Sequence, residues 1–98
     1  MSDLAKLQDA IRRLRGCESE HVSTVAVRET FNGAVAWHGD VEVFNLRGHP
    51  KARRCYAWAY QDDDRNDRYT AVIELPPVDS AQTAVRAAIV AQFKNEKT

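Results

Sequence analysis

Residues 24–44 read TVAVRETFNGAVAWHGDVEVF and give the clearest indication of the fold class. Apolar and polar side chains alternate on both sides of the Asn32-Gly33 dipeptide, which is the period-two pattern of half-buried strands. Asn-Gly between two such runs is a strong signal for a tight turn. The stretch therefore predicts a β-hairpin, with a first strand around Thr24–Thr30 and a second strand over Val35–Phe44.

The length of the turn decides which side chains face each other across this hairpin. A two-residue loop would pair Val27 with His38 and so mix apolar with polar partners. A three-residue loop, residues 31–33 with Gly33 in the left-handed region as in a G1 bulge, pairs Val27 with Trp37 instead. We expect the longer loop, because it gathers the apolar side chains on one face: Val25, Val27, Val35, Trp37, Val41 and Val43.

Two more strands and two helices are expected outside the hairpin. Alternating patterns indicate strands over Arg54–Gln61 and Arg68–Leu75. Apolar residues recur at helical spacing over Asp3–Arg15, where Gly16 supplies a stop, and again near Asp79–Lys94. The apolar stripes are Leu4, Leu7, Ile11 and Leu14 in the first helix, and Ala81, Ala84, Val85, Ala88, Ile89 and Phe93 in the second.

These elements predict an α+β fold with the order α-β-β-β-β-α. Short connections favour a four-stranded antiparallel meander sheet, with the N-terminal and the C-terminal helix packed on one face. The 98 residues fit a single compact domain over residues 1–98. No run approaches the roughly 20 apolar residues that span a bilayer, so no membrane contact is expected.

Composition and charge exclude several classes of protein. The chain is 44% hydrophobic and 29% charged, which is typical of a globular protein rather than a disordered one. Its 14 Lys and Arg balance its 14 Asp and Glu, so it lacks the basic excess with which most nucleic-acid binders contact phosphates. Two cysteines and a charged start without a signal-peptide pattern indicate the reducing cytoplasm.

Metal-binding and catalytic patterns are weak. Cys17 and His21 lie four residues apart, and His38, His49 and Cys55 could join them around zinc, but no C-x-x-C or H-x-x-x-H pair is present. We interpret the two cysteines as buried structural thiols. We expect no catalytic residue, no metal and no cofactor.

An acidic loop, Asp62–Asp67, separates the third and fourth strands. It begins with the D-x-D-x-N spacing of a calcium loop, but it lacks the glycine and the glutamate that such loops need at later positions. We interpret it as an acidic hairpin tip that keeps a sheet edge soluble.

A basic loop precedes the third strand. Its segment Gly48-His49-Pro50 is flanked by cationic side chains with no acidic neighbour in sequence, and such a patch can bind phosphate or another small anion. A solvated run of charge is the alternative interpretation. The candidate ligand-binding residues are Arg47, His49, Lys51, Arg53 and Arg54.

The third strand alternates aromatic with small side chains. We favour a core position for Tyr56, Trp58 and Tyr60, because buried aromatics supply the bulk that a small domain needs. In the alternative, these three join Arg28 and His38 on an open sheet surface, which could form an interface or stack bases.

Two classes of function follow. The favoured one is a non-enzymatic binding or assembly module that acts as a homodimer. The hairpin of the third and fourth strands is basic at one end and acidic at the other, so a twofold axis would place each basic end near the partner's acidic tip. The alternative is a binder of, or an enzyme acting on, a small anionic ligand at the basic loop from Arg47 to Arg54.

Overall fold

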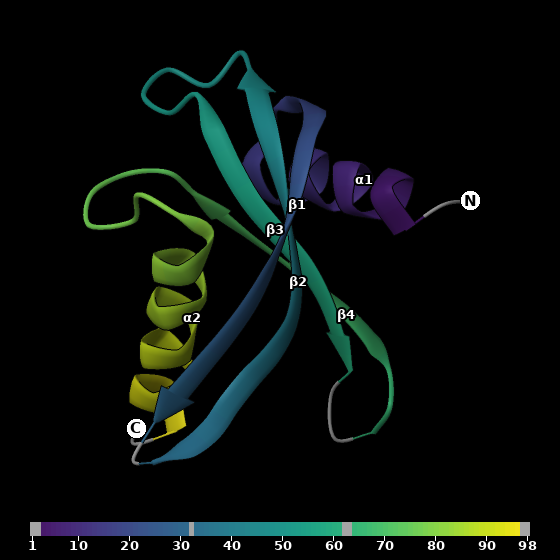
Figure 1. The fold of residues 1–98 in the computed structure, drawn as a ribbon. Coiled ribbons are helices and arrows are strands. Elements are labelled where there is room, and N and C mark those ends of the chain that lie inside the picture. The colour runs from purple at the N-terminus through teal and green to yellow at the C-terminus, as the bar shows by residue number, and fades with distance from the viewer. Residues whose placement is uncertain (1–2, 32, 62–63, 97–98) are drawn as a thin grey trace.

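The structure is a computed structural model that describes residues 3–31, 33–61 and 64–96. The elements in chain order are α1 (Asp3–Arg15), β1 (Glu18–Phe31), β2 (Ala34–Arg47), β3 (Arg54–Gln61), β4 (Asp67–Ile73) and α2 (Ala81–Glu96). This is the predicted order, and Figure 1 shows the long β1–β2 hairpin crossing the molecule between the two helices.

The sheet is an antiparallel meander. Within the described residues it has four strands in the order β1-β2-β3-β4, so consecutive strands are neighbours and β1 and β4 form the edges. Tyr56 of β3 lies opposite Val43 of β2 on one side and Val72 of β4 on the other. The α+β class and the meander topology are therefore confirmed.

The register of the first hairpin differs from the expected one. Phe31 pairs with Ala34, so the chain turns within two residues, and an irregularity next to Glu29 then shifts the pairing. Val27 consequently lies opposite Gly39, and the expected pairing of Val27 with Trp37 is wrong. Over residues 23–29 the shift amounts to two positions, and because side chains alternate with period two it leaves these side chains on the predicted face. Val35 instead pairs with Thr30 beyond the irregularity, so its predicted place on the face of Val27 is wrong.

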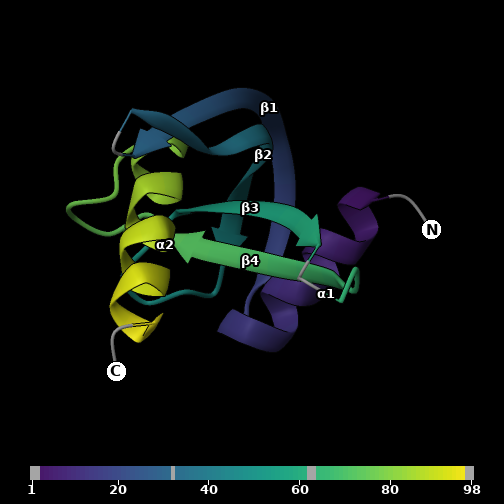
Figure 2. The same ribbon diagram turned by 90° about the horizontal axis from the view of Figure 1, so that it is seen from below.

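The two helices pack on opposite faces of the sheet, so the expectation that both cover one face is wrong. Figures 1 and 2 show them apart, with the strands between them. The buried cluster under α2 contains Val27, Val41, Val43, Tyr56, Trp58, Val78, Ala81, Ala84 and Val85. The buried cluster under α1 contains Leu7, Ile11, Phe44, Cys55, Ala57 and Ala71.

The alternation of β3 is the physical reason for this arrangement. Its aromatic side chains Tyr56 and Trp58 pack below α2, whereas Cys55 and Ala57 on the other face are small enough to let α1 approach. Both faces of β3 are therefore buried over residues 55–58.

The end of α1 follows the predicted stop signal, and the start of α2 has a side-chain cap. Gly16 has a φ of 69°, and its N–H donates to the carbonyl oxygen of Arg12 at 2.9 Å. Ser80 caps α2, since its Oγ accepts the N–H of Thr83 at 3.2 Å. Neither helix, over its described residues, is long and apolar enough to cross a membrane.

Polar contacts fix the β1–β2 hairpin against α2. Glu29 of β1 accepts a hydrogen bond from Gln82 and forms an ion pair with Arg86 at 3.2 Å. Gln82 also donates to the backbone oxygen of Arg28 at 3.1 Å. These contacts hold the outer part of the hairpin beside the helix, and they lower the pKa of Glu29, chiefly through the hydrogen bond from Arg86.

Candidate functional site

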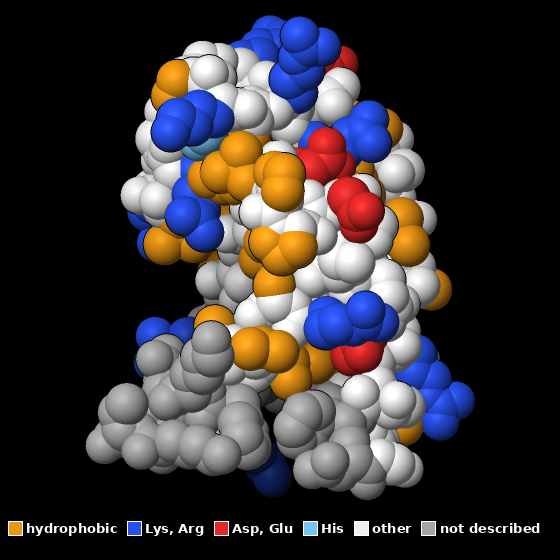
Figure 3. All heavy atoms as spheres, turned by 90° about the vertical axis from the view of Figure 1, so that its left-hand side faces the viewer, with side chains coloured by type: hydrophobic (Ala, Val, Ile, Leu, Met, Phe, Trp, Pro, Cys, Tyr) orange, Lys and Arg blue, Asp and Glu red, His pale blue; other side chains and the backbone are white. Residues whose placement is uncertain are grey.

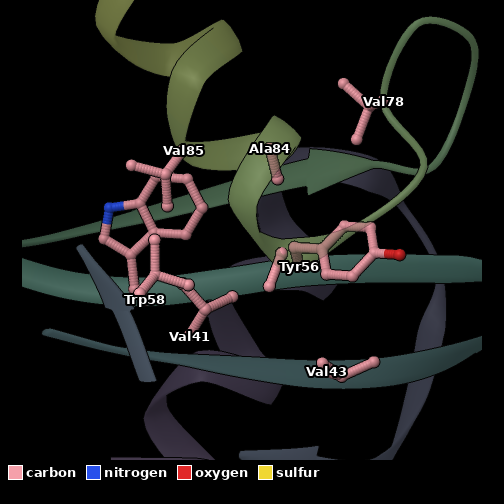
Figure 4. Close-up of a cluster of buried hydrophobic side chains, with 9 residues drawn as sticks. Val41, Val43, Tyr56, Trp58, Val78, Ala84 and Val85 are labelled. Atoms are coloured by element: carbon pink, nitrogen blue, oxygen red, sulfur yellow. The ribbon is translucent and has the colours of Figure 1, made fainter. Parts of the chain in front are cut away.

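The aromatic side chains of β3 are divided between the core and the surface. Tyr56 and Trp58 are 3% and 4% exposed, so their predicted core position is confirmed and the open-surface alternative is wrong for them. Figure 4 shows Trp58 beside Val85 and Tyr56 below Ala84 of α2. Tyr60 at the end of the strand is 42% exposed, so its predicted core position is wrong.

Arg28 and His38 do not join these aromatic residues. They lie directly opposite each other on β1 and β2 and both are exposed. Their neighbour Val27 points towards α2, so Arg28 points to the other face of the sheet. The five residues of the predicted aromatic surface are therefore split between the two faces.

The basic loop uses some of its residues for internal contacts. The Nδ1 atom of His49 accepts the N–H groups of Lys51 and Ala52 at 3.1 and 2.9 Å, so this imidazole holds the loop in shape. Arg47 forms an ion pair with Glu20 of β1 at 2.9 Å. Lys51 remains exposed.

A depression of about 600 Å³ lies beside this loop. Arg47, Arg53 and Arg54 line it together with Glu20 and Glu74. The structure thus brings three of the predicted basic residues together, but it also adds two carboxylates that the sequence places far away. An anion would meet both signs of charge there.

Glu74 has a second role beside β3. The Tyr56 hydroxyl donates a hydrogen bond to its carboxylate. Burial, and then this carboxylate, raise the pKa of Tyr56 to about 12. The contact ties the segment after β4 to the core strand.

A larger cleft, which the sequence did not indicate, lies between α2 and the sheet. It has a volume of about 730 Å³. We call it the aromatic cleft, since Trp37, Trp58 and Tyr60 line it on the sheet side, opposite Ala87, Ala88 and Ala91 of α2. The alanines are the sequence signal that could have found it, because small side chains on a helix leave room above large ones on a sheet.

The two tryptophans of the chain meet in this cleft. Their ring centroids are 5.6 Å apart and the rings are tilted by 54°. Trp37 rests on Gly39, where a Cβ atom would lie 3.1 Å from two atoms of its six-membered ring. Glycine at this position therefore lets the indole lie flat along β2 and form part of the cleft wall.

Arg15 lies at the rim of the aromatic cleft. From the last turn of α1, its Nε and Nη2 atoms donate to the carbonyl oxygen of Ala71 on the edge strand β4, at 3.2 and 2.7 Å. Of the described residues that line the cleft, Arg15 is the one that carries a charge. The described lining therefore combines one positive charge with aromatic walls.

The two cysteines are not among the described residues that line the cleft. Cys17 and Cys55 are buried free thiols, as predicted. Burial raises the pKa of Cys55 to about 12. Among the described residues, no three His, Cys, Asp or Glu side chains lie close enough to hold a metal ion. Asp62 and Asp63 of the acidic loop lie outside the described residues.

Comparison with family models, curated proteins and solved structures finds no match for this chain.

Proposed function

We propose that the protein is a non-enzymatic binding module and that its ligand occupies the aromatic cleft. The observation that carries the proposal is the convergence of Trp37 and Trp58 on one cleft beneath the alanines of α2. Its volume of about 730 Å³ lies within the range of small-molecule sites, roughly 300 to 1,000 Å³.

The lining favours a ligand with a flat apolar part. Indole and phenol rings bind planar groups by stacking and edge contacts, each worth about 0.5–1.5 kcal/mol beyond the buried area. Thr70 and Gln61 add a small number of polar groups, which is typical of sites that orient an apolar ligand. Hydrophobic side chains form a broken strip over the face that presents α2, with charged side chains on both sides of it (Figure 3).

A pair of helix variants tests where a ligand binds. Ala91→Phe narrows the aromatic cleft, whereas Val90→Phe places the same side chain at a neighbouring position of α2 that is 43% exposed and outside the lining. We expect planar aromatic compounds to raise the melting temperature of the parent and of Val90→Phe. Ala91→Phe should bind at least ~10-fold more weakly, a loss of ~1.4 kcal/mol. Equal binding by both variants would place the ligand elsewhere.

A second candidate is the binding of a small anion at the basic loop. The depression lined by Arg47, Arg53 and Arg54 favours it. Arg53→Gln should then weaken stabilisation by inorganic phosphate or citrate, while Arg13→Gln on α1 should not. The nearby carboxylates of Glu20 and Glu74 disfavour anions, and for this reason we rank this candidate second.

A further inference from the structure

We propose that the ligand of the aromatic cleft is an aromatic carboxylate, with its ring system against Trp37 and Trp58 and its carboxylate at Arg15. This inference rests on the proposed function and adds the chemical class of the ligand. Three observations carry it: the position of Arg15, the partners of its guanidinium group, and the charge of the cleft lining.

The arginines at the end of α1 differ in their partners. Arg12 forms an ion pair with Glu18 at 2.8 Å, and Arg13 forms one with Asp9 at 3.0 Å. Arg15 instead donates to a neutral carbonyl oxygen, that of Ala71. Its positive charge is therefore held in place at the rim without being offset by a carboxylate in that contact.

The geometry of the guanidinium group leaves donors for a ligand. A guanidinium carries five N–H donors, and the Ala71 oxygen takes one from Nε and one from Nη2. The remaining donors, on Nη1 and Nη2, can receive the two oxygens of a carboxylate. Charge-assisted bonds of this kind are roughly twice as strong as neutral ones.

The lining decides between anionic, neutral and cationic ligands. Aromatic walls alone would accept all three and would favour a cation through its attraction to the ring faces. Arg15 repels a cation, and no acidic side chain stands among the described lining residues to offset it. A flat apolar ligand with one negative group therefore matches both the walls and the rim.

A matched pair of ligands tests this inference. 2-Naphthoate and 2-naphthamide share one ring system and differ in the charge of one group. We expect the parent protein at pH 7 to bind the carboxylate about 10-fold more tightly than the amide in calorimetric titrations.

Three variants assign this preference to Arg15. In Arg15→Gln the ratio of the amide Kd to the carboxylate Kd should fall to about 1. The Kd of the amide itself should stay within about 2-fold of the parent value. Arg15→Lys keeps the charge and should retain part of the preference. Arg13→Gln, a change in the same helical turn, should retain all of it. A purely structural effect of Arg15 would weaken both ligands alike.

The outcomes separate the two proposals. If the parent binds both ligands equally, the ligand class is overturned. If Arg15→Gln keeps the preference, the placement of the carboxylate at Arg15 is overturned. Neither result overturns binding in the cleft. If neither ligand binds the parent, the proposed function is overturned as well. If Arg15→Gln does not fold, the Kd ratios of the parent, Arg15→Lys and Arg13→Gln are compared instead. Equal ratios in these three proteins would contradict the role of Arg15.

Discussion

Gly39 is the residue on which the wall of the aromatic cleft depends most directly. A Cβ atom here would lie 3.1 Å from Cη2 and Cζ2 of Trp37, so Gly39→Ala must displace the indole ring. We predict that this variant loses about 1 kcal/mol of unfolding free energy in urea titrations. It should also weaken ligand binding in the cleft.

The same substitution in a Trp37→Val background is the matched control. Without the indole, alanine should stabilise β2 by roughly 0.5–1 kcal/mol, because glycine loses more conformational entropy in a strand. An equal loss of stability in both backgrounds would show that Trp37 does not rest on Gly39.

Cys55 should make stability depend on alkaline pH. Burial raises its pKa from 9.0 to about 12, so the folded state holds the thiol proton more tightly than the unfolded state does. The stabilisation of the folded state by the neutral Cys55 thiol is therefore fully present below pH 9, and it is lost as the pH rises towards 12. From pH 8 to pH 10 the unfolding free energy of the parent should fall by about 1.4 kcal/mol more than that of Cys55→Ala.

Urea titrations at the two pH values measure this difference between parent and variant. Other titrating groups are common to both proteins and cancel. Parallel pH dependence of the two proteins would mean that the Cys55 thiol is not held in its neutral form by burial.

At the scale of elements, α1 contributes a core of its own. Ile11 is fully buried against the sheet face opposite α2, so Ile11→Ala should cost roughly 2–5 kcal/mol of unfolding free energy. Leu14 belongs to the same predicted stripe but is 55% exposed, and Leu14→Ala should change stability by no more than about 0.5 kcal/mol. Similar losses for the two variants in thermal unfolding would contradict the position of α1.

Elements with a local cause could be predicted from the sequence. The helix Asp3–Arg15 follows from leucine spacing and Gly16, and the strand Arg54–Gln61 follows from alternation, and both have the predicted bounds. The faces of most of the first hairpin could also be predicted, since the two-position shift over residues 23–29 leaves them unchanged. The irregularity next to Glu29, which moves Val35 to the other face, has no signal in the alternation.

The placement of the helices depends on tertiary packing. Alternation in β3 separates large from small side chains but does not show that each set has its own helix. Leu14 and Val25 fit the apolar stripes, yet they are 55% and 38% exposed, because packing and not periodicity decides burial. The side chain of Phe93, which belongs to the predicted stripe of α2, lies outside the described part.

The candidate site could be predicted only in part. A cleft needs residues from β2, β3, β4 and α2 in one place, and no local pattern in the sequence contains this information. The role of Arg15 could not be predicted either, because its partner Ala71 is 56 residues away in the chain.

At the scale of the whole molecule, the homodimer stays a prediction. Both faces of β3 are buried over residues 55–58, so affinity would come from exposed apolar residues such as Val22, Val25 and Val35 on the first hairpin. Charge would align the two protomers of the dimer, because the basic loop and the acidic residues Asp64 and Asp67 lie near opposite ends of β3.

Sedimentation tests this prediction. We expect a dimer that weakens as salt rises from about 0.05 to 0.5 M, since the screening length falls from roughly 14 to 4 Å over this range. A monomer at every salt concentration and about 100 μM protein would eliminate the dimer. A dimer whose dissociation constant does not change with salt would show that charge does not align the two protomers, and it would leave dimerisation itself standing.

Both tryptophans of the chain line the aromatic cleft, so their indole signals report directly on binding there. Two-dimensional NMR resolves the indole N–H signal of each tryptophan, and both can be followed while 2-naphthoate is added. We predict that both signals shift, saturate with one Kd, and shift far less in Ala91→Phe than in Val90→Phe. Indole signals that stay in place while 2-naphthoate binds, with shifts confined to the basic loop, would contradict the cleft as the binding site.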